Sequence, residues 1–224
     1  MTKSAQLVYF ADPMCSWCWG FSPVIEAARS RFGEELPVRL ILGGLRPGTT
    51  EVMDEAAKRM IREHWDHVRE ASGQPFDHAF FEREGFVYDT EPACRAVVAV
   101  RRRDAGAALA FLKHLHHAFY AGNQDVTDRE TLCALAAEFG LDRESFATAF
   151  DDEETIAETR RDFAIARRAG ITGFPTLLAG SNDDGYAVVT PGYQSWQKVE
   201  RLITAWLERR RGQVDTAAST ADRS

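Results

Sequence analysis

The 224-residue sequence has little cysteine, no excess of positive charge and no long hydrophobic run. Its net charge of −7 argues against a nucleic-acid partner, because binding to the phosphate backbone requires a basic surface. No stretch approaches the roughly 18 consecutive apolar residues of a membrane-spanning helix, so we expect no membrane partner. A chain of this length can bury a hydrophobic core without the help of disulfides or metal.

The apolar run at residues 7–11 is shorter than the apolar region of about 7–15 residues in a secretory signal peptide. We therefore expect a cytoplasmic protein, in a reducing compartment where structural disulfides are rare. The cysteines are Cys15, Cys18, Cys94 and Cys133. A CxxC pair in a cytosolic protein is usually catalytic or metal-binding, so residues 15–18 form the leading candidate site.

The order of the expected elements indicates the fold class. Residues 6–44 read as strand, helix and strand, in which the helix begins near the cysteine pair. About 120 residues of mostly helical pattern follow, and then a hairpin at 175–190 and an amphipathic helix at 195–210. This order predicts an α/β protein, a thioredoxin fold with a large all-helical domain inserted between its β-α-β and β-β-α halves.

The corresponding division of the chain is discontinuous. We expect a thioredoxin-like domain over residues 1–46 and 164–210 and a helical insertion domain over residues 47–163. The tail over residues 211–224 is small and polar, and we expect it to be disordered.

The position of the CxxC pair, between a strand and a helix N-terminus, favours thiol chemistry. The N–H groups of the first helical turn and the helix dipole stabilise a negative charge, so we expect Cys15 to be an exposed attacking thiolate. Cys18 lies one turn further along on the same side and can resolve a mixed disulfide. The intervening Ser16 and Trp17 are expected to tune the redox potential.

A zinc site is the alternative use of such a pair. Structural zinc needs four closely placed ligands, usually in two close pairs, and no second cysteine pair exists. We therefore expect no metal and no bound cofactor. The histidines at 114, 116 and 117 are expected on a partly exposed helix, and Cys94 and Cys133 as buried free thiols.

Three stretches make the prediction more specific: DPMCSWCWGF at 12–21, AFYAGNQDVTDRETLCALAAEFGLD at 118–142 and AGITGFPTLL at 169–178. With them the sequence resembles the DsbA-like thioredoxin-fold family. The resemblance is strongest to the cytosolic branch of predicted disulfide isomerases and oxidoreductases that resemble FrnE. It covers about residues 6–208.

The resemblance implies a role for several residues. Cys15 matches the family's nucleophile and Cys18 its resolving cysteine. Pro175 matches the cis-proline that packs beside the pair. The backbone of Phe174, just before it, would pair with an extended substrate segment, and Thr176 would support this loop.

One position departs from the family pattern. Many members carry a buried acidic residue six positions before the nucleophile, to help proton transfer, and here that position is Tyr9. Asp12 is the nearest carboxylate in the sequence, and the sequence does not say whether it faces the sulfurs. The departure affects the route of proton transfer rather than the class of reaction.

Three functions remain open at this stage. The preferred one is a thiol-disulfide oxidoreductase or isomerase that acts on a disulfide- or thiol-bearing protein or small molecule, with glutathione as a redox partner. A glutathione-dependent transferase or isomerase of the kappa or hydroxychromene-carboxylate type is an alternative, although such enzymes do not depend on a CxxC pair. The third is a non-enzymatic peptide-binding module. Exposed helices in the insertion would allow a homodimer.

Overall fold

The computed structural model of the chain describes residues 5–221, with side chains as far as residue 212. Its strands are β1 (Gln6–Ala11), β2 (Val38–Leu42), β3 (Thr176–Ser181) and β4 (Gly185–Thr190). Its α-helices are α1 (Ser16–Phe32), α2 (Glu55–Ser72), α3 (Glu91–Arg103), α4 (Ala108–Tyr120), α5 (Arg129–Glu138), α6 (Arg143–Asp151), α7 (Glu153–Arg168) and α8 (Trp196–Ala221). The sequence order is therefore β-α-β, a run of helices, and β-β-α, as predicted.

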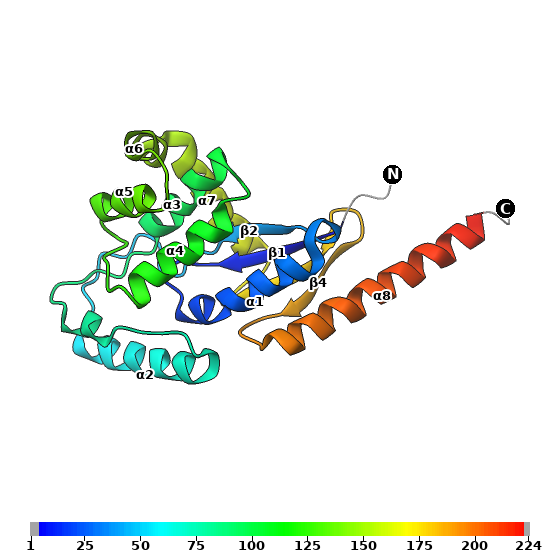
Figure 1. Cartoon of the computed structure of the whole chain (residues 1–224), viewed down its shortest axis with the longest axis horizontal. Helices are drawn as coiled ribbons and strands as arrows, with labels where there is room; N and C mark the ends of the chain where they lie inside the picture. Colours follow the sequence, from blue (N-terminus) through cyan, green and yellow to red (C-terminus); the bar gives the residue numbers. More distant parts are fainter. Residues whose placement is uncertain (1–4, 222–224) are drawn as a thin grey trace.

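The strands form one mixed sheet in the order β2-β1-β3-β4 (Figure 1). β1 pairs in parallel with β2 and antiparallel with β3, which in turn pairs antiparallel with β4. Because β1 is central, its side chains alternate between two buried faces. Leu7, Tyr9 and Ala11 belong to the large core that includes α1, whereas Val8 and Phe10 pack with residues of β2 and α7.

The helices α2 to α7 lie between β2 and β3 in the chain. Most of them gather near one end of the sheet, whereas α7 packs on the face that carries Val8 and Phe10 (Figure 1). Four of these helices have an aspartate as N-cap, whose side chain accepts a hydrogen bond from a backbone N–H in the first turn. They are Asp54 of α2, Asp128 of α5, Asp142 of α6 and Asp152 of α7. A single apolar core runs from β1 and α1 into these helices. The insertion therefore packs directly behind the start of α1.

Two expected boundaries differ from the structure. The boundary between residues 163 and 164 falls inside α7, which packs against β2 and continues to Arg168. The tail expected to be disordered over 211–224 is helical through Ala221, and residues 222–224 lie outside the described part. No proline interrupts the tail, so the helix that begins at Trp196 can propagate through its alanines.

Within residues 5–221, no helix has both the length and the apolar character needed to cross a bilayer.

Candidate functional site

The cysteine pair lies where the chain leaves β1 and enters α1. The Cys15 backbone N–H donates to the Asp12 carbonyl oxygen at 3.1 Å, which closes a turn after the strand. Cys15 is the N-cap of α1, and its carbonyl oxygen accepts from the N–H groups of Cys18 at 3.0 Å and Trp19 at 3.1 Å. Its side chain therefore stands at the positive end of the helix dipole, as predicted. Both cysteines are free thiols.

The loop before β3 lies against this pair. The peptide bond between Phe174 and Pro175 is cis, and the Phe174 carbonyl oxygen accepts a hydrogen bond from the Cys15 thiol at 3.4 Å. The Thr176 hydroxyl donates to the Gly173 carbonyl oxygen at 2.8 Å and so holds the loop from its other side. The structure thus brings together the residues that the first and third stretches predicted.

A glycine at the end of β2 makes room for this loop. A Cβ atom added to Gly43 would lie 2.0 Å from the tip of the Phe174 ring, far inside van der Waals contact. The Gly43 N–H also donates to the Ala11 carbonyl oxygen at 2.7 Å, which extends the pairing of β1 with β2 by one residue. Only a residue without a side chain fits between strand and loop here.

The expectation of an exposed Cys15 needs correction. Cys15 is only 6% exposed, and Cys18 is fully buried. The Cys15 sulfur turns inward to the Phe174 carbonyl, which keeps it from projecting into solvent. Ser16 and Trp17, between the cysteines, are half-buried, and the Trp17 ring packs on Tyr193 with centroids 5.4 Å apart.

Burial raises the pKa of the Cys18 thiol well above its usual value, and the neighbouring Cys15 and the charge of Asp12 raise it further. A backbone hydrogen bond from Asp12 acts in the opposite direction. Cys18 therefore carries its proton at neutral pH. Any reaction in which it acts as a nucleophile must first remove that proton.

Asp12 is buried directly behind the pair. One carboxylate oxygen accepts from the Met14 N–H at 2.9 Å, and the other accepts from the Leu45 N–H at 2.7 Å and from the Cys94 thiol at 3.4 Å. Burial raises the pKa of Asp12, while these donors lower it. The carboxyl group therefore joins the cysteine loop to the end of β2 and to α3.

Tyr9, six positions before Cys15, is fully buried, and both cysteines act on it electrostatically. Its hydroxyl has no hydrogen-bond partner among the described residues. Burial raises the pKa of Tyr9 well above its usual value, and negative charge on Cys18 and Cys15 raises it further. The hydroxyl is therefore neutral and close enough to the Cys18 sulfur to feel its charge.

His116 is a site residue that the sequence reasoning missed. It was expected on a partly exposed helix, but it is only 1% exposed. Its ring nitrogens lie 3.1 Å from the Asp12 carbonyl oxygen and 3.2 Å from the Ser22 hydroxyl. Burial lowers the pKa of His116 to about 4, so the ring is neutral at physiological pH. His116 lies four residues after the buried Leu112 and therefore on the same face of α4, and this spacing was the sequence signal for its burial.

Cys94 and Cys133 are buried free thiols, as predicted. In the part of the chain that the structure describes, no cluster of three or more histidine, cysteine or acidic side chains is placed to hold a metal ion.

Known proteins share this architecture. The family model of the DSBA-like thioredoxin domain matches residues 6–204. The crystal structure of a candidate protein disulfide isomerase from Nitrosomonas europaea superposes with a TM-score of 0.87 and 36% identity, over 92% of this chain and 99% of that one. The cytosolic disulfide reductase DsbM from Pseudomonas aeruginosa, also solved with GSH, has a TM-score of 0.75 and 31% identity, over 92% of this chain and 98% of that one.

One relative is named for a role other than thiol-disulfide exchange. The ClpXP adapter protein SpxH of Bacillus subtilis is 24% identical over 205 residues, which is 90% of this chain and 67% of the adapter. The chain thus spans about two thirds of the adapter's length. The family match covers most of the chain and includes the cysteine pair and the cis-proline loop, and the chain belongs to the DSBA-like thioredoxin domain family.

Proposed function

We propose that the chain is a thiol-disulfide oxidoreductase in which Cys15 attacks and Cys18 resolves. The observation that carries the proposal is the position of the Cys15 sulfur, at the N-terminus of α1 and within hydrogen-bond reach of the Phe174 carbonyl. The helix end stabilises a thiolate, and the loop offers a backbone acceptor next to it. This is the arrangement that an extended substrate with a disulfide would require.

The reaction proceeds in two exchanges. The Cys15 thiolate attacks one sulfur of a substrate disulfide, forms a mixed disulfide and releases the other substrate sulfur as a thiolate. Cys18 loses its proton and attacks the Cys15 sulfur, which releases the second substrate thiolate and leaves a Cys15–Cys18 disulfide. The substrate disulfide is reduced by two electrons, and the cysteine pair is oxidised by two. Ser16 and Trp17 flank the reacting sulfurs, and Phe174 to Thr176 form the wall against which the substrate backbone pairs.

The direction that we propose is disulfide reduction in the cytoplasm, with glutathione restoring the dithiol. The similarity to a protein named cytosolic disulfide reductase, solved with GSH, supports this direction. Glutathione would attack the oxidised pair at Cys15, and a second glutathione would release the first as its disulfide. An isomerase activity uses the same mixed disulfide without net oxidation of the pair.

The test is the midpoint potential of the pair. The purified protein would be equilibrated in graded glutathione buffers, and free thiols would be counted by alkylation and mass. We expect a reversible two-electron transition between about −120 and −270 mV, towards the negative end if the protein is a reductase. The Cys133→Ser variant should retain the transition and Cys15→Ser should lose it. A wild-type protein without a reversible disulfide would refute the proposal.

A partner-binding role is the second candidate, and the similarity to the ClpXP adapter SpxH favours it. Such a role would not require thiol exchange. Partner binding that is the same for wild type and Cys15→Ser would support this role, whereas loss of binding on that change would tie it to the redox pair.

A further inference from the structure

The strand β2 leaves part of its backbone without a neighbouring strand. It lies at the edge of the sheet and pairs with β1 alone, in parallel (Figure 1). The Gly43 N–H just after it donates to the Ala11 carbonyl oxygen, and alternate residues of a strand direct their backbone groups to the same side. The odd-numbered residues of β2 therefore bond to β1, whereas Val38, Leu40 and Leu42 direct their backbone groups to the outer side.

Two charged side chains cover the C-terminal half of this outer side. An Asp162 carboxylate oxygen accepts from the Leu42 N–H at 2.9 Å, and Arg101 donates to the Leu40 carbonyl oxygen at 3.0 Å. The two side chains also form an ion pair at 2.7 Å, and together they protect the edge in place of a further strand. This cover ends at Leu40. The N–H groups of Val38 and Leu40 and the Val38 carbonyl oxygen bond to no described residue, and we call residues 38–40 the open edge of β2.

A surface cavity of about 460 Å³ lies against the open edge. Its volume falls in the range of about 300–1,000 Å³ that is usual for ligand sites. Val38 and Leu40 line it from the strand. Leu109 lines it from α4, and Arg161 and Ile165 line it from α7. The cavity therefore has room for a short extended segment beside the strand, between these two helices.

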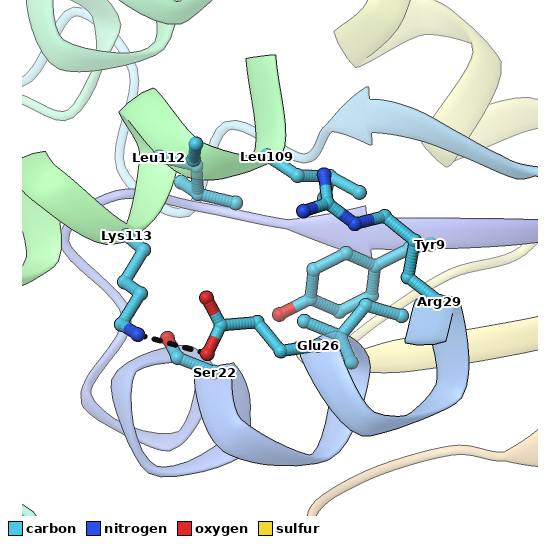
Figure 2. A pocket seen from close by; sticks show the side chains of 9 residues that line it. Tyr9, Ser22, Glu26, Arg29, Leu109, Leu112 and Lys113 are labelled. Carbon is cyan, nitrogen blue, oxygen red and sulfur yellow. Dashed lines mark hydrogen bonds and ion pairs between the residues drawn. The ribbon is translucent and has the colours of Figure 1, made fainter. Parts of the chain in front are cut away.

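Leu109 also lines a smaller cavity, between α1 and α4 (Figure 2). That cavity leaves about 10 Å³ for the centre of a water molecule, which is just enough for one. Glu26 and Lys113 border it and form an ion pair at 2.8 Å (Figure 2). The smaller cavity therefore has no room for a polypeptide, in contrast to the one beside β2.

The charges around the open edge favour an acidic ligand. The acidic residues that line the cavity are already engaged, because Asp162 and Glu158 each pair with Arg101 at 2.7 Å. Arg39 lines the cavity, is exposed and forms no ion pair with the described residues. Arg161 has an exposed partner on its own helix at 3.3 Å, and such surface pairs are weak. Two arginines therefore remain for a negatively charged group on a ligand.

The two walls of the cavity differ in character. Val38 and Leu40 face the large core that includes α4, whereas Arg39 lies between them in sequence and faces the other side with Ile41, towards α7. Residues paired across two strands lie on the same face of a sheet. A segment paired with the open edge would therefore place alternate side chains against Leu109 and against Arg39.

We propose that the open edge of β2 binds an extended segment of a partner protein in which apolar and acidic residues alternate. The segment adds a strand to the sheet: it accepts from the N–H groups of Val38 and Leu40 and donates to the Val38 carbonyl oxygen. Its apolar side chains pack on Leu109, and its acidic ones pair with Arg39 and Arg161. A second copy of β2 fits less well, because it would bring two copies of Arg39 together. Docking here goes beyond the proposed thiol exchange, since no cysteine lines the cavity.

The probe is a fluorescein-labelled, end-capped hexapeptide of alternating valine and glutamate, and fluorescence anisotropy follows its binding. We expect saturable binding below about 1 mM. Arg39→Glu should weaken it about tenfold, because an attraction becomes a repulsion. A hexapeptide of alternating valine and lysine should show the opposite order and bind Arg39→Glu more tightly than wild type. Arg59→Glu makes the same charge change at an exposed position of α2 and should bind both peptides as wild type does.

Methylated peptides test the strand pairing itself. Alternate N–H groups of an extended segment face opposite sides, so N-methylation of every second residue blocks one side only. Methylation of the residues whose N–H groups face β2 should abolish binding, whereas methylation of the other set should leave it unchanged. These residues are the valines in an antiparallel arrangement and the glutamates in a parallel one. Undiminished binding of both methylated peptides would overturn the proposal, and this measurement on wild type decides if Arg39→Glu does not fold.

Equal affinity of wild type and Arg39→Glu for the valine–glutamate peptide would also overturn the proposal. A wild-type protein that binds no peptide and sediments as a dimer would overturn it in favour of a second copy. Cys15→Ser should bind the peptide as wild type does, and Arg39→Glu should form the mixed disulfide with oxidised glutathione at the wild-type rate. Failure of peptide binding would therefore leave the proposed function intact, and the absence of a reversible disulfide would leave the docking site intact.

Discussion

The Cys15 thiol donates a hydrogen bond to the Phe174 carbonyl oxygen, although the two residues are 159 positions apart in the sequence. They meet because β1 and β3 are neighbours in the sheet, with Phe10 paired to Thr176. Each strand continues by a few residues to reach the site, β1 forwards to the cysteine and β3 backwards to the loop. The register of the sheet therefore sets the distance between Cys15 and the cis-proline loop.

Replacing one cysteine at a time should separate attack from resolution. With oxidised glutathione, Cys18→Ser should accumulate a mixed disulfide with glutathione at Cys15, because the resolving thiol is gone. Cys15→Ser should form little adduct, because Cys18 is fully buried and its raised pKa keeps it protonated. Intact-mass measurement after acid quenching distinguishes the species. An adduct on Cys18 as fast as on Cys15 would reverse the assigned roles.

Gly43→Ala should disturb the site through the Phe174 loop. The new methyl group would lie 2.0 Å from the Phe174 ring, so the ring must move. We expect a loss of about 1–3 kcal/mol in the free energy of unfolding, as for other overpacked positions. The first exchange step should slow several-fold, because the Phe174 carbonyl shifts relative to the sulfur.

Gly173→Ala is the matched control for that change. It lies in the same loop, but a Cβ there would contact nothing within 4 Å. Urea unfolding and the rate of mixed-disulfide formation should both stay near wild type. Equal behaviour of the two glycine variants would show that the close approach at Gly43 has no bearing on the reaction.

The sequence predicted the strands and helices well because their patterns are local. A short, continuous apolar run marked β1, and the cysteine pair followed it at the expected helix start. The roles that the sequence could not assign depend on contacts between distant elements. The direction of the Asp12 carboxylate is set by the Leu45 N–H of the loop after β2 and by Cys94 of α3. The cysteine spacing gave no sign of the inward turn of Cys15.

The helical histidines illustrate the same limit. The cluster at 114–117 is polar in composition, which suggested an exposed surface. The ring of His116 is instead buried because α4 packs on α1, where Ser22 and the Asp12 carbonyl provide its hydrogen-bond partners. A polar side chain can replace an apolar one at a buried position only when such partners exist, and a sequence does not display them.

Asp12→Asn should change how stability depends on pH. Burial raises the pKa of Asp12 above its unfolded value of about 3.9, so the folded state holds this proton more tightly. Stability from this group is present below about pH 4 and is lost as the pH rises through the folded-state pKa. The variant loses one hydrogen-bond acceptor, so its free energy of unfolding should be about 1 kcal/mol lower than that of wild type at low pH. The advantage of wild type over the variant should therefore shrink as the pH rises.

Urea unfolding at a series of pH values, from about pH 4 to neutrality, would measure this difference. Glu63→Gln removes a charge from the exposed side of α2 and should leave the pH dependence of wild type unchanged. A wild-type advantage that grows with pH would mean that the folded protein favours the charged carboxylate.

His116→Gln should alter the acid limb of the stability curve. Burial lowers the pKa of His116 to about 4, against an unfolded value of about 6.5. The unfolded state therefore takes up the proton first, and wild-type stability should fall as the pH falls from about 6.5 to 4, by about 3 kcal/mol in total. Glutamine does not titrate, so the stability of the variant should lack this slope. Near neutral pH its free energy of unfolding should be lower than that of wild type, because the contacts with Ser22 and the Asp12 carbonyl are weakened. His67→Gln, at an exposed position of α2, is the control and should keep the wild-type slope. An unchanged slope in His116→Gln would mean that the buried ring is not the group that titrates.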